Sequence, residues 1–377
     1  MYRRVFSLVF ALAVVIVAAQ EKQVRQSAEP QTAATDSKTD EPVVEKFRVS
    51  GDPVSTPQMV AGSFGPIRCQ DGDVLIRPIG ANAGPLTSSL VRLSADGKSS
   101  LQFDLNTVPE LSGKQFLAPV YALDKSGRAY FLVRLINPGN PEKEPLFLVA
   151  FSADGSYSWQ VELDRTLWPY SLAVFSSGDF LISAMEGAPY ERREQNGQQA
   201  QRPAKSFTGI FGRDGRLKRS LESAVEEGSV DTNQVAEDKA VIPKLQFGDA
   251  VTGPDGYVYL LRSPSEPRVE IWSEGGEQIR VLKLKPAMKD AQAGNLMVTD
   301  SALALRFLGP AAKDPKTGAS RHADMIWAVY DSTTGEPLHY YDAYSVKGLL
   351  ACFEREQFTF IVPKLDRMAL LRVDIRQ

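Results

Sequence analysis

The chain has 377 residues, of which 43% are hydrophobic and 24% are charged, and its formal net charge is −3 at pH 7. This composition is typical of a globular protein with a sizeable core. A weakly acidic chain without basic runs argues against nucleic acid as a partner. Its two cysteines are too few for a metal site with four cysteine ligands.

A short basic segment followed by an apolar run begins the chain. Arg3 and Arg4 precede an uncharged run that ends in the small residues Ala18 and Ala19. Because a membrane-spanning helix needs roughly 20 apolar residues, this shorter run predicts a secretory signal peptide over residues 1–19. An uncleaved membrane anchor is the alternative. We expect a secreted or periplasmic protein that has no transmembrane span once the signal is removed.

The segment 20–43 differs in composition from the rest of the chain. It is rich in Gln, Ser, Thr, Ala, Pro and charged residues and has few large apolar side chains. Such a segment cannot bury enough surface to offset the entropy of ordering it. The sequence therefore predicts a disordered linker over 20–43 and a folded domain over 44–377.

Glycine turns recur through the folded part at a nearly constant interval. Five of them follow an apolar strand and are separated by 58, 60, 61 and 59 residues: Gly97, Gly155, Gly215, Gly276 and Gly335. Earlier turns at Gly72, Gly127, Gly178 and Gly256 each mark a second hairpin before one of these. Two hairpins make a four-stranded antiparallel unit, and repeated units of this kind predict an all-β, six-bladed β-propeller.

The last of the six predicted units is incomplete. The units cover 63–104, 119–163, 171–221, 246–284, 295–343 and 349–375, and the sixth has only three strands. An open ring would leave a long unpaired edge. The run 44–49 has no partner of its own, so we expect this N-terminal strand to pair with the last blade and close the ring. Deletion of residues 43–50 should then destabilise the whole domain.

One part of the chain is similar to a known repeat family. The stretch from Phe247 to Leu260, followed by Arg268 to Gly276, resembles the repeats of NHL-type propellers. The Asn-His-Leu signature of that family is absent from every unit. The resemblance implies a disc with a central channel and no particular activity.

The long connecting segments predict where a ligand would bind. In blades with strands a to d from the inside outward, the segments 80–88, 137–145, 186–206, 222–244 and 309–323 all join b to c or d to the next a. They therefore share one face, and long loops on a rigid scaffold usually carry binding. Aromatic and arginine side chains are enriched in binding surfaces, so the candidate ligand-binding residues are Trp168, Tyr170, Tyr190, Arg192, Arg193, Arg321, His322 and Tyr344. The alternative is that Trp168 and Tyr170 pack between the second and third units, and that the loop arginines are simply solvated.

The acidic residues of the turns favour structure over metal binding. Asp before Gly suits a tight hairpin, and these turns lack the alternating oxygen ligands of a calcium loop. Two histidines, His322 and His339, cannot build a three-histidine site, and no catalytic sequence signature is present. Sparse acids and amides near the inner strands (Asp249, Asn295 and Asp300) leave one enzyme alternative, a propeller hydrolase or lyase with a calcium-type divalent-metal site in the channel.

The predicted function is an exported, non-catalytic binding propeller that holds a protein or a cell-envelope component. We expect a monomer without a cofactor.

The two cysteines fall in units that a closed ring would make neighbours. Cys69 ends strand a of the first unit, and Cys352 lies in strand a of the sixth. A pair of cysteines in an exported protein indicates one disulfide. The alternative is two separate buried thiols, because inner strands of adjacent blades can lie farther apart than the ~7 Å limit between bridged Cα atoms.

Overall fold

The computed structural model of the protein has one folded unit that carries every residue described below. The described residues are 43–49, 51–56, 62–63, 68–79, 89–136, 144–186, 193–195, 198–200, 205–221, 249–262, 265–313, 320–322, 324–354, 356–364 and 367–375. They all lie within the compact unit Pro42–Gln377. The predicted signal peptide and nearly all of the predicted linker, residues 1–42, lie outside the described residues.

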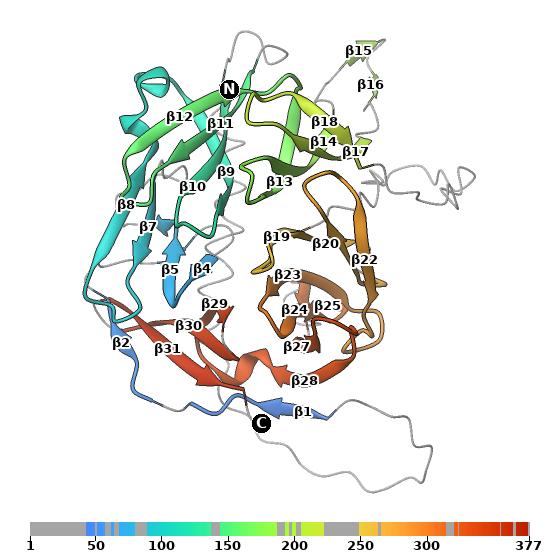
Figure 1. The fold of residues 1–377 in the computed structure, drawn as a ribbon. Coiled ribbons are helices and arrows are strands. Elements are labelled where there is room, and N and C mark those ends of the chain that lie inside the picture. Colours follow the sequence, from blue (N-terminus) through green and yellow to red (C-terminus); the bar gives the residue numbers. More distant parts are fainter. Residues whose placement is uncertain are drawn as a thin grey trace, which may run out of the picture. The chain divides into compact units, whose positions relative to one another are not determined.

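Six four-stranded antiparallel sheets form a ring, so the fold is the predicted six-bladed β-propeller (Figure 1). The first strand of each blade lies against the first strands of both neighbours all the way around. The ring arises because each blade is too small to bury its own apolar faces and must use those of its neighbours.

The strands of each blade, from inner to outer, have the following bounds. Blade one contains β4 (Arg68–Gln70), β5 (Asp73–Ile76), β7 (Ser89–Leu93) and β8 (Ser100–Asp104), and blade two contains β9 (Phe116–Leu123), β10 (Ala129–Leu135), β11 (Leu146–Phe151) and β12 (Tyr157–Glu162). Blade three contains β13 (Leu167–Val174), β14 (Phe180–Glu186), β17 (Lys205–Phe211) and β18 (Leu217–Ser220), and blade four contains β19 (Ala250–Thr252), β20 (Val258–Arg262), β21 (Arg268–Trp272) and β22 (Gln278–Lys283). Blade five contains β23 (Gln292–Val298), β24 (Ala302–Leu308), β27 (Met325–Asp331) and β28 (Pro337–Asp342), and blade six contains β29 (Leu349–Glu354), β30 (Gln357–Pro363), β31 (Met368–Asp374) and β2 (Val54–Ser55).

The turns form where the Asp-Gly pattern predicts them. Gly155, in the turn between β11 and β12, has a φ of 83°, and a Cβ atom there would lie 2.6 Å from the carbonyl oxygen of Gln102 in blade one. Both the positive φ and this close approach exclude a larger residue. Beside it, Asp154 Oδ1 accepts hydrogen bonds from Ser156 N at 3.0 Å and Ser156 Oγ at 2.6 Å. The acidic side chain thus closes the turn on itself.

The core is divided among the gaps between blades. Among the described residues, buried apolar side chains form six clusters, one between each pair of neighbouring blades. The second strands are deeply buried, because every residue of β20 and all but the last residue of β10 and of β14 are buried. Their mainly apolar sequences follow from burial on both faces of each sheet.

An N-terminal strand does pair with the last blade and close the ring, but it is a later segment than 44–49. Val54 pairs with Leu370 and Ser55 with Ala369, so β2 becomes the antiparallel outer strand of blade six. Thr56 continues this contact, because both its N–H and its hydroxyl donate to Met368 O at 3.1 Å. A strand of two residues is enough to complete blade six, because the turn at Gly97 of blade one also packs against β2.

The expected closing segment instead extends blade five. Strand β1 (Val44–Lys46) pairs in parallel with the outer strand β28 and makes it a five-stranded sheet. The reason lies one residue beyond β1, where Phe47 fills the gap between blades five and six. Its ring stacks on Tyr341 at 4.7 Å and meets Phe358 and Phe360 edge-on at 5.1 Å.

A disulfide joins Cys69 of β4 and Cys352 of β29, whose Cα atoms are 5.7 Å apart. This distance lies within the range that a disulfide spans. The bridge connects the inner strands of blades one and six, while β2 connects the same two blades at the outer edge. The junction between the first and last blades, which we call the seam, is therefore held by a disulfide at the inner strands and by strand pairing at the outer edge.

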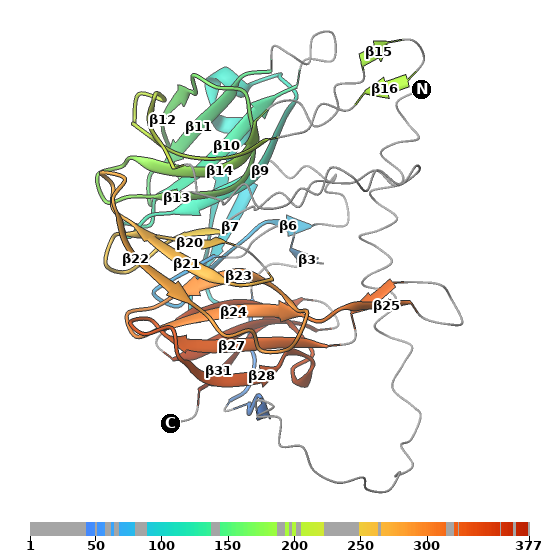
Figure 2. The same ribbon diagram turned by 90° about the vertical axis from the view of Figure 1, so that its right-hand side faces the viewer.

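The connections sort onto two faces. The a–b and c–d turns, between two and six residues long, form one face, which we call the turn face. The b–c and d–a segments form the other, the loop face. In blades one, three and five the b–c segments contribute short strands of their own: β6 (Pro78–Ile79), which pairs with β3 (Gly62–Ser63), β15 (Arg193–Gln195) with β16 (Gln198–Ala200), and β25 (Ala311–Lys313) with β26 (Ser320–His322). Figure 2 shows β3, β6, β15, β16 and β25 on the same side of the ring.

Candidate binding face

Trp168 begins β13 at the loop face and is half-buried between blades two and three. The Arg134 guanidinium of β10 lies over its indole ring, with Cζ 3.9 Å from the ring centre. Arg134 also pairs with Glu144, at 3.2 Å from Nε to the carboxylate. Trp168 thus belongs to an inter-blade contact, which is the packing role considered as the alternative to ligand binding.

Tyr170 and Tyr344 are the two predicted residues whose side chains are exposed among those described, Tyr344 in a loop-face connection and Tyr170 in the half of β13 nearer that face. Tyr170 lies two residues after Trp168 and is 40% exposed. Tyr344 lies in the short 3₁₀ turn η4 (Ala343–Ser345), which connects blades five and six, and is 50% exposed. Asp342 holds this turn in place by accepting a 2.9 Å hydrogen bond from the Tyr344 N–H.

The remaining predicted residues are described only in part. Tyr190 and Arg192 lie outside the described residues. Arg193 lies in β15, and Arg321 and His322 lie in β26, where they pair with Ala312 and Ala311. The structure describes these three through their backbone alone and places both strand pairs on the loop face.

Four arginines that the sequence reasoning missed lie at or just after the second strands of their blades. They end the runs Val74-Leu-Ile-Arg77, Phe131-Leu-Val-Arg134, Tyr259-Leu-Leu-Arg262 and Leu303-Ala-Leu-Arg306. Second strands run from the turn face to the loop face, so these guanidinium groups lie at the loop-face end of the blades. The recurring signal, an apolar run ended by arginine, was visible in the sequence.

Burial lowers the pKa of all four arginines. The best partnered is Arg262, which is 4% exposed and lies 3.3 Å from the Glu270 carboxylate. It also donates to Thr208 Oγ1 at 3.0 Å and to the carbonyl of Leu221 at 3.5 Å. This arrangement offsets much of the cost of burying the charge and joins blades three and four.

Arg306 faces an acidic group from the neighbouring blade. The nearby charges of Asp249 and Tyr344 partly oppose the lowering of its pKa by burial. Asp249 also accepts a 2.9 Å hydrogen bond from the Leu296 N–H. Asp249 therefore has a structural role in joining blades four and five, whereas Asp300 lies at the opposite, turn-face end of β23.

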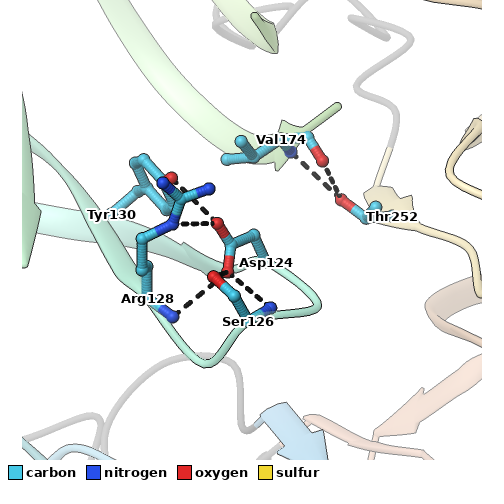
Figure 3. A network of polar contacts seen from close by, with 6 residues as sticks. All are labelled: Asp124, Ser126, Arg128, Tyr130, Val174 and Thr252. Atoms are coloured by element: carbon cyan, nitrogen blue, oxygen red, sulfur yellow. Dashed lines mark hydrogen bonds and ion pairs between the residues drawn. The ribbon is translucent and has the colours of Figure 1, made fainter. Parts of the chain in front are cut away.

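The turn face has its own polar network, built on a buried carboxylate. Asp124 accepts hydrogen bonds from Ser126, from the backbone and guanidinium of Arg128, and from the Tyr130 hydroxyl (Figure 3). The adjacent Lys125 donates to the carbonyl of Pro254, which connects the inner turns of blades two and four. These contacts lie at the end of the ring opposite Trp168 and Tyr344.

The described residues contain no group of three or more His, Cys, Asp and Glu side chains placed to hold a metal ion. They also contain no helix with the length and apolar character that crossing a bilayer requires.

No protein-family model matches the sequence, and no curated protein matches it. Among solved structures, a protein of unknown function from Dyadobacter fermentans aligns at 11% identity and a TM-score of 0.45, over 86% of this chain and 97% of that one. The Pan2 WD40 domain of Neurospora crassa aligns at 10% identity and a TM-score of 0.40, over 84% and 90%. BamB from Moraxella catarrhalis aligns at 14% identity and a TM-score of 0.35, over 82% and 85%. Similarities of this size carry no argument about function, and the NHL-type resemblance has no support from them.

Proposed function

We propose that this chain is an exported, non-catalytic interaction propeller that holds a protein or a cell-envelope component on its loop face. The observation that carries the proposal is the division of the two faces. All the a–b and c–d turns are short, whereas the b–c segments of blades one, two, three and five are 10 to 18 residues long. Long segments on one side of a rigid ring are the usual form of a binding surface.

The exposed side chains of the loop face support the same proposal. Tyr170 and Tyr344 present large aromatic groups to solvent there. Tyrosine combines a large apolar area with a polar tip and is enriched in protein interfaces. Their positions on β13 and η4 hold them on the scaffold and not on the long segments, so little entropy would be lost on binding.

Export is supported by one feature before the folded domain and one within it. The basic and apolar pattern of residues 1–19 is typical of a signal peptide. The Cys69–Cys352 disulfide suits an oxidising compartment. N-terminal sequencing of the protein recovered from the cell envelope or the medium tests this part, and a chain that still begins at Met1 in the cytoplasm would contradict it.

The binding face is tested by photo-crosslinking from single positions in the producing cell. A photoreactive phenylalanine analogue replaces Tyr170, Tyr344 or Tyr257 in three separate variants. Tyr257 is the matched control, because it is 38% exposed and follows the inner turn of blade four on the turn face. We expect the same adduct from positions 170 and 344 and none from position 257.

Adducts from position 257 alone, or from none of the three, would contradict the proposal. Metal analysis of the purified protein separates it from the propeller hydrolase or lyase. Bound divalent metal whose removal abolishes an activity would favour the enzyme.

A further inference from the structure

Arg77 differs from Arg134, Arg262 and Arg306 because no acidic side chain among the described residues lies against it. It follows β5 directly and precedes β6, so it lies at the loop-face end of blade one. Only 5% of the residue is exposed. Within the described part of the chain, neither its Nε nor its Nη2 atom has a hydrogen-bond partner.

Among the described residues, no acidic side chain pairs with Arg77. Arg134 has Glu144, Arg262 has Glu270 and Arg306 has Asp249, whereas the described neighbour of Arg77 is the Tyr121 ring, with Cζ 5.6 Å from its centre. Asp73 of the same blade lies at the opposite, turn-face end of β5 and pairs with Arg92 at 3.0 Å. The segments that flank β3 and β6 in the sequence, 57–61, 64–67 and 80–88, contain no Asp or Glu.

A buried guanidinium without an anion is costly, because the charge loses its hydration and gains no compensating partner. Burial accordingly lowers the pKa of Arg77, and the nearby Tyr121 opposes this only in part. Substituting an apolar residue of similar length at such a position is often neutral or stabilising. An arginine that weakens the fold at its own position is typical of a binding site, where stability is exchanged for function.

The two atoms without partners define the shape of the missing group. Nε and Nη2 lie on the same edge of the planar guanidinium, and their N–H bonds point in parallel. Such an edge matches the two oxygens of a carboxylate, which accepts one hydrogen bond on each. A single guanidinium neutralises one carboxylate, whereas a phosphate dianion would need further cations.

We propose that Arg77, with Tyr121 beneath its guanidinium, is a binding site for a carboxylate group of the partner held on the loop face. The inference rests on the proposed function, because it names the chemistry by which that partner is recognised. It predicts a partner that presents a free carboxylate, such as an acidic side chain or a chain terminus, to the loop-face end of the gap between blades one and two.

The test measures thermal unfolding of the full chain with small probes at constant ionic strength. N-acetylglycine supplies a carboxylate, N-acetylglycinamide is its neutral counterpart, and inorganic phosphate is the competing oxyanion. The variants are R77M, which removes the charge, and R77K, which keeps the charge but lacks the two parallel N–H donors of the guanidinium. R92M is the matched control, because Arg92 lies in the same blade and already has Asp73 as a partner.

We expect N-acetylglycine to raise the unfolding temperature of the wild type and of R92M saturably, by about 2 °C. The amide should have no effect. In R77M the rise should disappear while the unfolding temperature without probe stays unchanged or increases. R77K should lose most of the rise, because a lysine offers no parallel pair of donors.

A rise that persists in R77M, no rise in the wild type, or a rise with phosphate alone would each overturn the carboxylate site. A large loss of stability in R77M without probe would also overturn it, since Arg77 would then be a structural residue. Crosslinking from positions 170 and 344 in the R77M background separates the two proposals. Adducts that persist there without a carboxylate response leave the interaction propeller standing and remove this inference.

Discussion

At the scale of single residues, the most heavily bonded polar group among the described residues of the turn face is Asp124. Its Oδ1 atom accepts from Ser126 N, Ser126 Oγ and Arg128 N at 2.7 to 3.1 Å, and its Oδ2 atom accepts from Arg128 Nε at 2.6 Å and from Tyr130 Oη at 2.9 Å. Figure 3 shows how these donors surround the carboxylate. The group is a turn cap that also fixes the beginning of β10.

Replacing Asp124 by asparagine should destabilise the domain. The amide removes the negative charge that Arg128 pairs with and presents an NH₂ group to donors that need an acceptor. The expected loss is about 2–4 kcal/mol of unfolding free energy, the range for a charged, buried hydrogen-bonded group. Chemical denaturation measures it, with D154N as the control, because Asp154 closes an equivalent turn in solvent. An equal effect of the two substitutions would contradict this role.

The same carboxylate predicts a pH dependence. Burial alone would raise the pKa of Asp124, but hydrogen bonds from Ser126, Arg128 and Tyr130 outweigh it and lower the pKa in the folded state. A depressed folded pKa contributes stability that is present above the unfolded value of about 3.9 and is lost as the pH falls through the folded value. Between pH 6 and pH 3, the wild type should therefore lose more unfolding free energy than D124N. Parallel pH profiles of the two proteins would contradict the prediction.

At the scale of elements, strand β1 is held less by its pairing than by Phe47. Three parallel residue pairs join β1 to β28. Phe47 then inserts into the aromatic group of Tyr341, Phe358 and Phe360, and its N–H donates to Ser345 Oγ at 3.0 Å. The strand thus connects the outer edge of blade five to the gap before blade six.

Replacing Phe47 by alanine should cost about 3–5 kcal/mol of unfolding free energy, the usual range for a phenylalanine removed from a core. Phe47 is 7% exposed, whereas Val49, two residues on, is 54% exposed. The control V49A should therefore change stability by less than about 0.5 kcal/mol. Equal effects in denaturant titrations of the two variants would show that the segment after β1 does not anchor it.

The elements also show which parts of the structure the sequence could predict. The hairpins followed from local chemistry, because Asp and Gly at the turns and apolar runs between them fix each strand pair. The closing strand was assigned to the wrong segment because 44–49 has the more apolar and longer run. The segment 44–49 pairs with β28 because Phe47 fits a gap between two blades. A parallel pairing of this kind leaves no signal in the local sequence. The same limit applies to Arg77 and Arg134. Alternation of side chains along a strand does not show whether an arginine faces solvent or packs against a neighbouring blade.

At the scale of the whole molecule, the ring depends on a seam fastened at two places. Equal spacing of the glycine turns predicted five of the blades, and the apolar strands of 349–375 predicted the sixth. The position of the seam followed from the three-stranded last unit. Which residues fasten it did not follow, since a two-residue strand such as β2 cannot be distinguished from the surrounding loop.

Removing the disulfide should weaken the folded state of the whole ring. The bridge joins residues 283 apart in the sequence, and a chain-entropy account of so long a loop gives up to about 5 kcal/mol. We expect a reductant to lower the unfolding temperature of the wild type and to leave the C69S/C352S variant unchanged. Intact-mass measurement before and after reduction checks that the bridge is present. If a reductant leaves the unfolding temperature of the oxidised wild type unchanged, the bridge does not have this role.

The two fastenings should also be coupled, because each holds the same pair of blades in place when the other is lost. Thr56→Pro removes both hydrogen bonds to Met368 O and so weakens the attachment of β2 to β31 without changing the cysteines. In wild-type protein reduction leaves β2 in place, and in T56P the oxidised bridge still joins β4 and β29. Reducing T56P breaks the bridge while β2 is weakened, so its loss of unfolding free energy should exceed the sum of the separate losses by about 1–3 kcal/mol. Hydrogen exchange should then rise first in blades one and six. Additive losses, or exchange that rises evenly around the ring, would mean that the blades adjoining the seam hold together through their packed cluster alone.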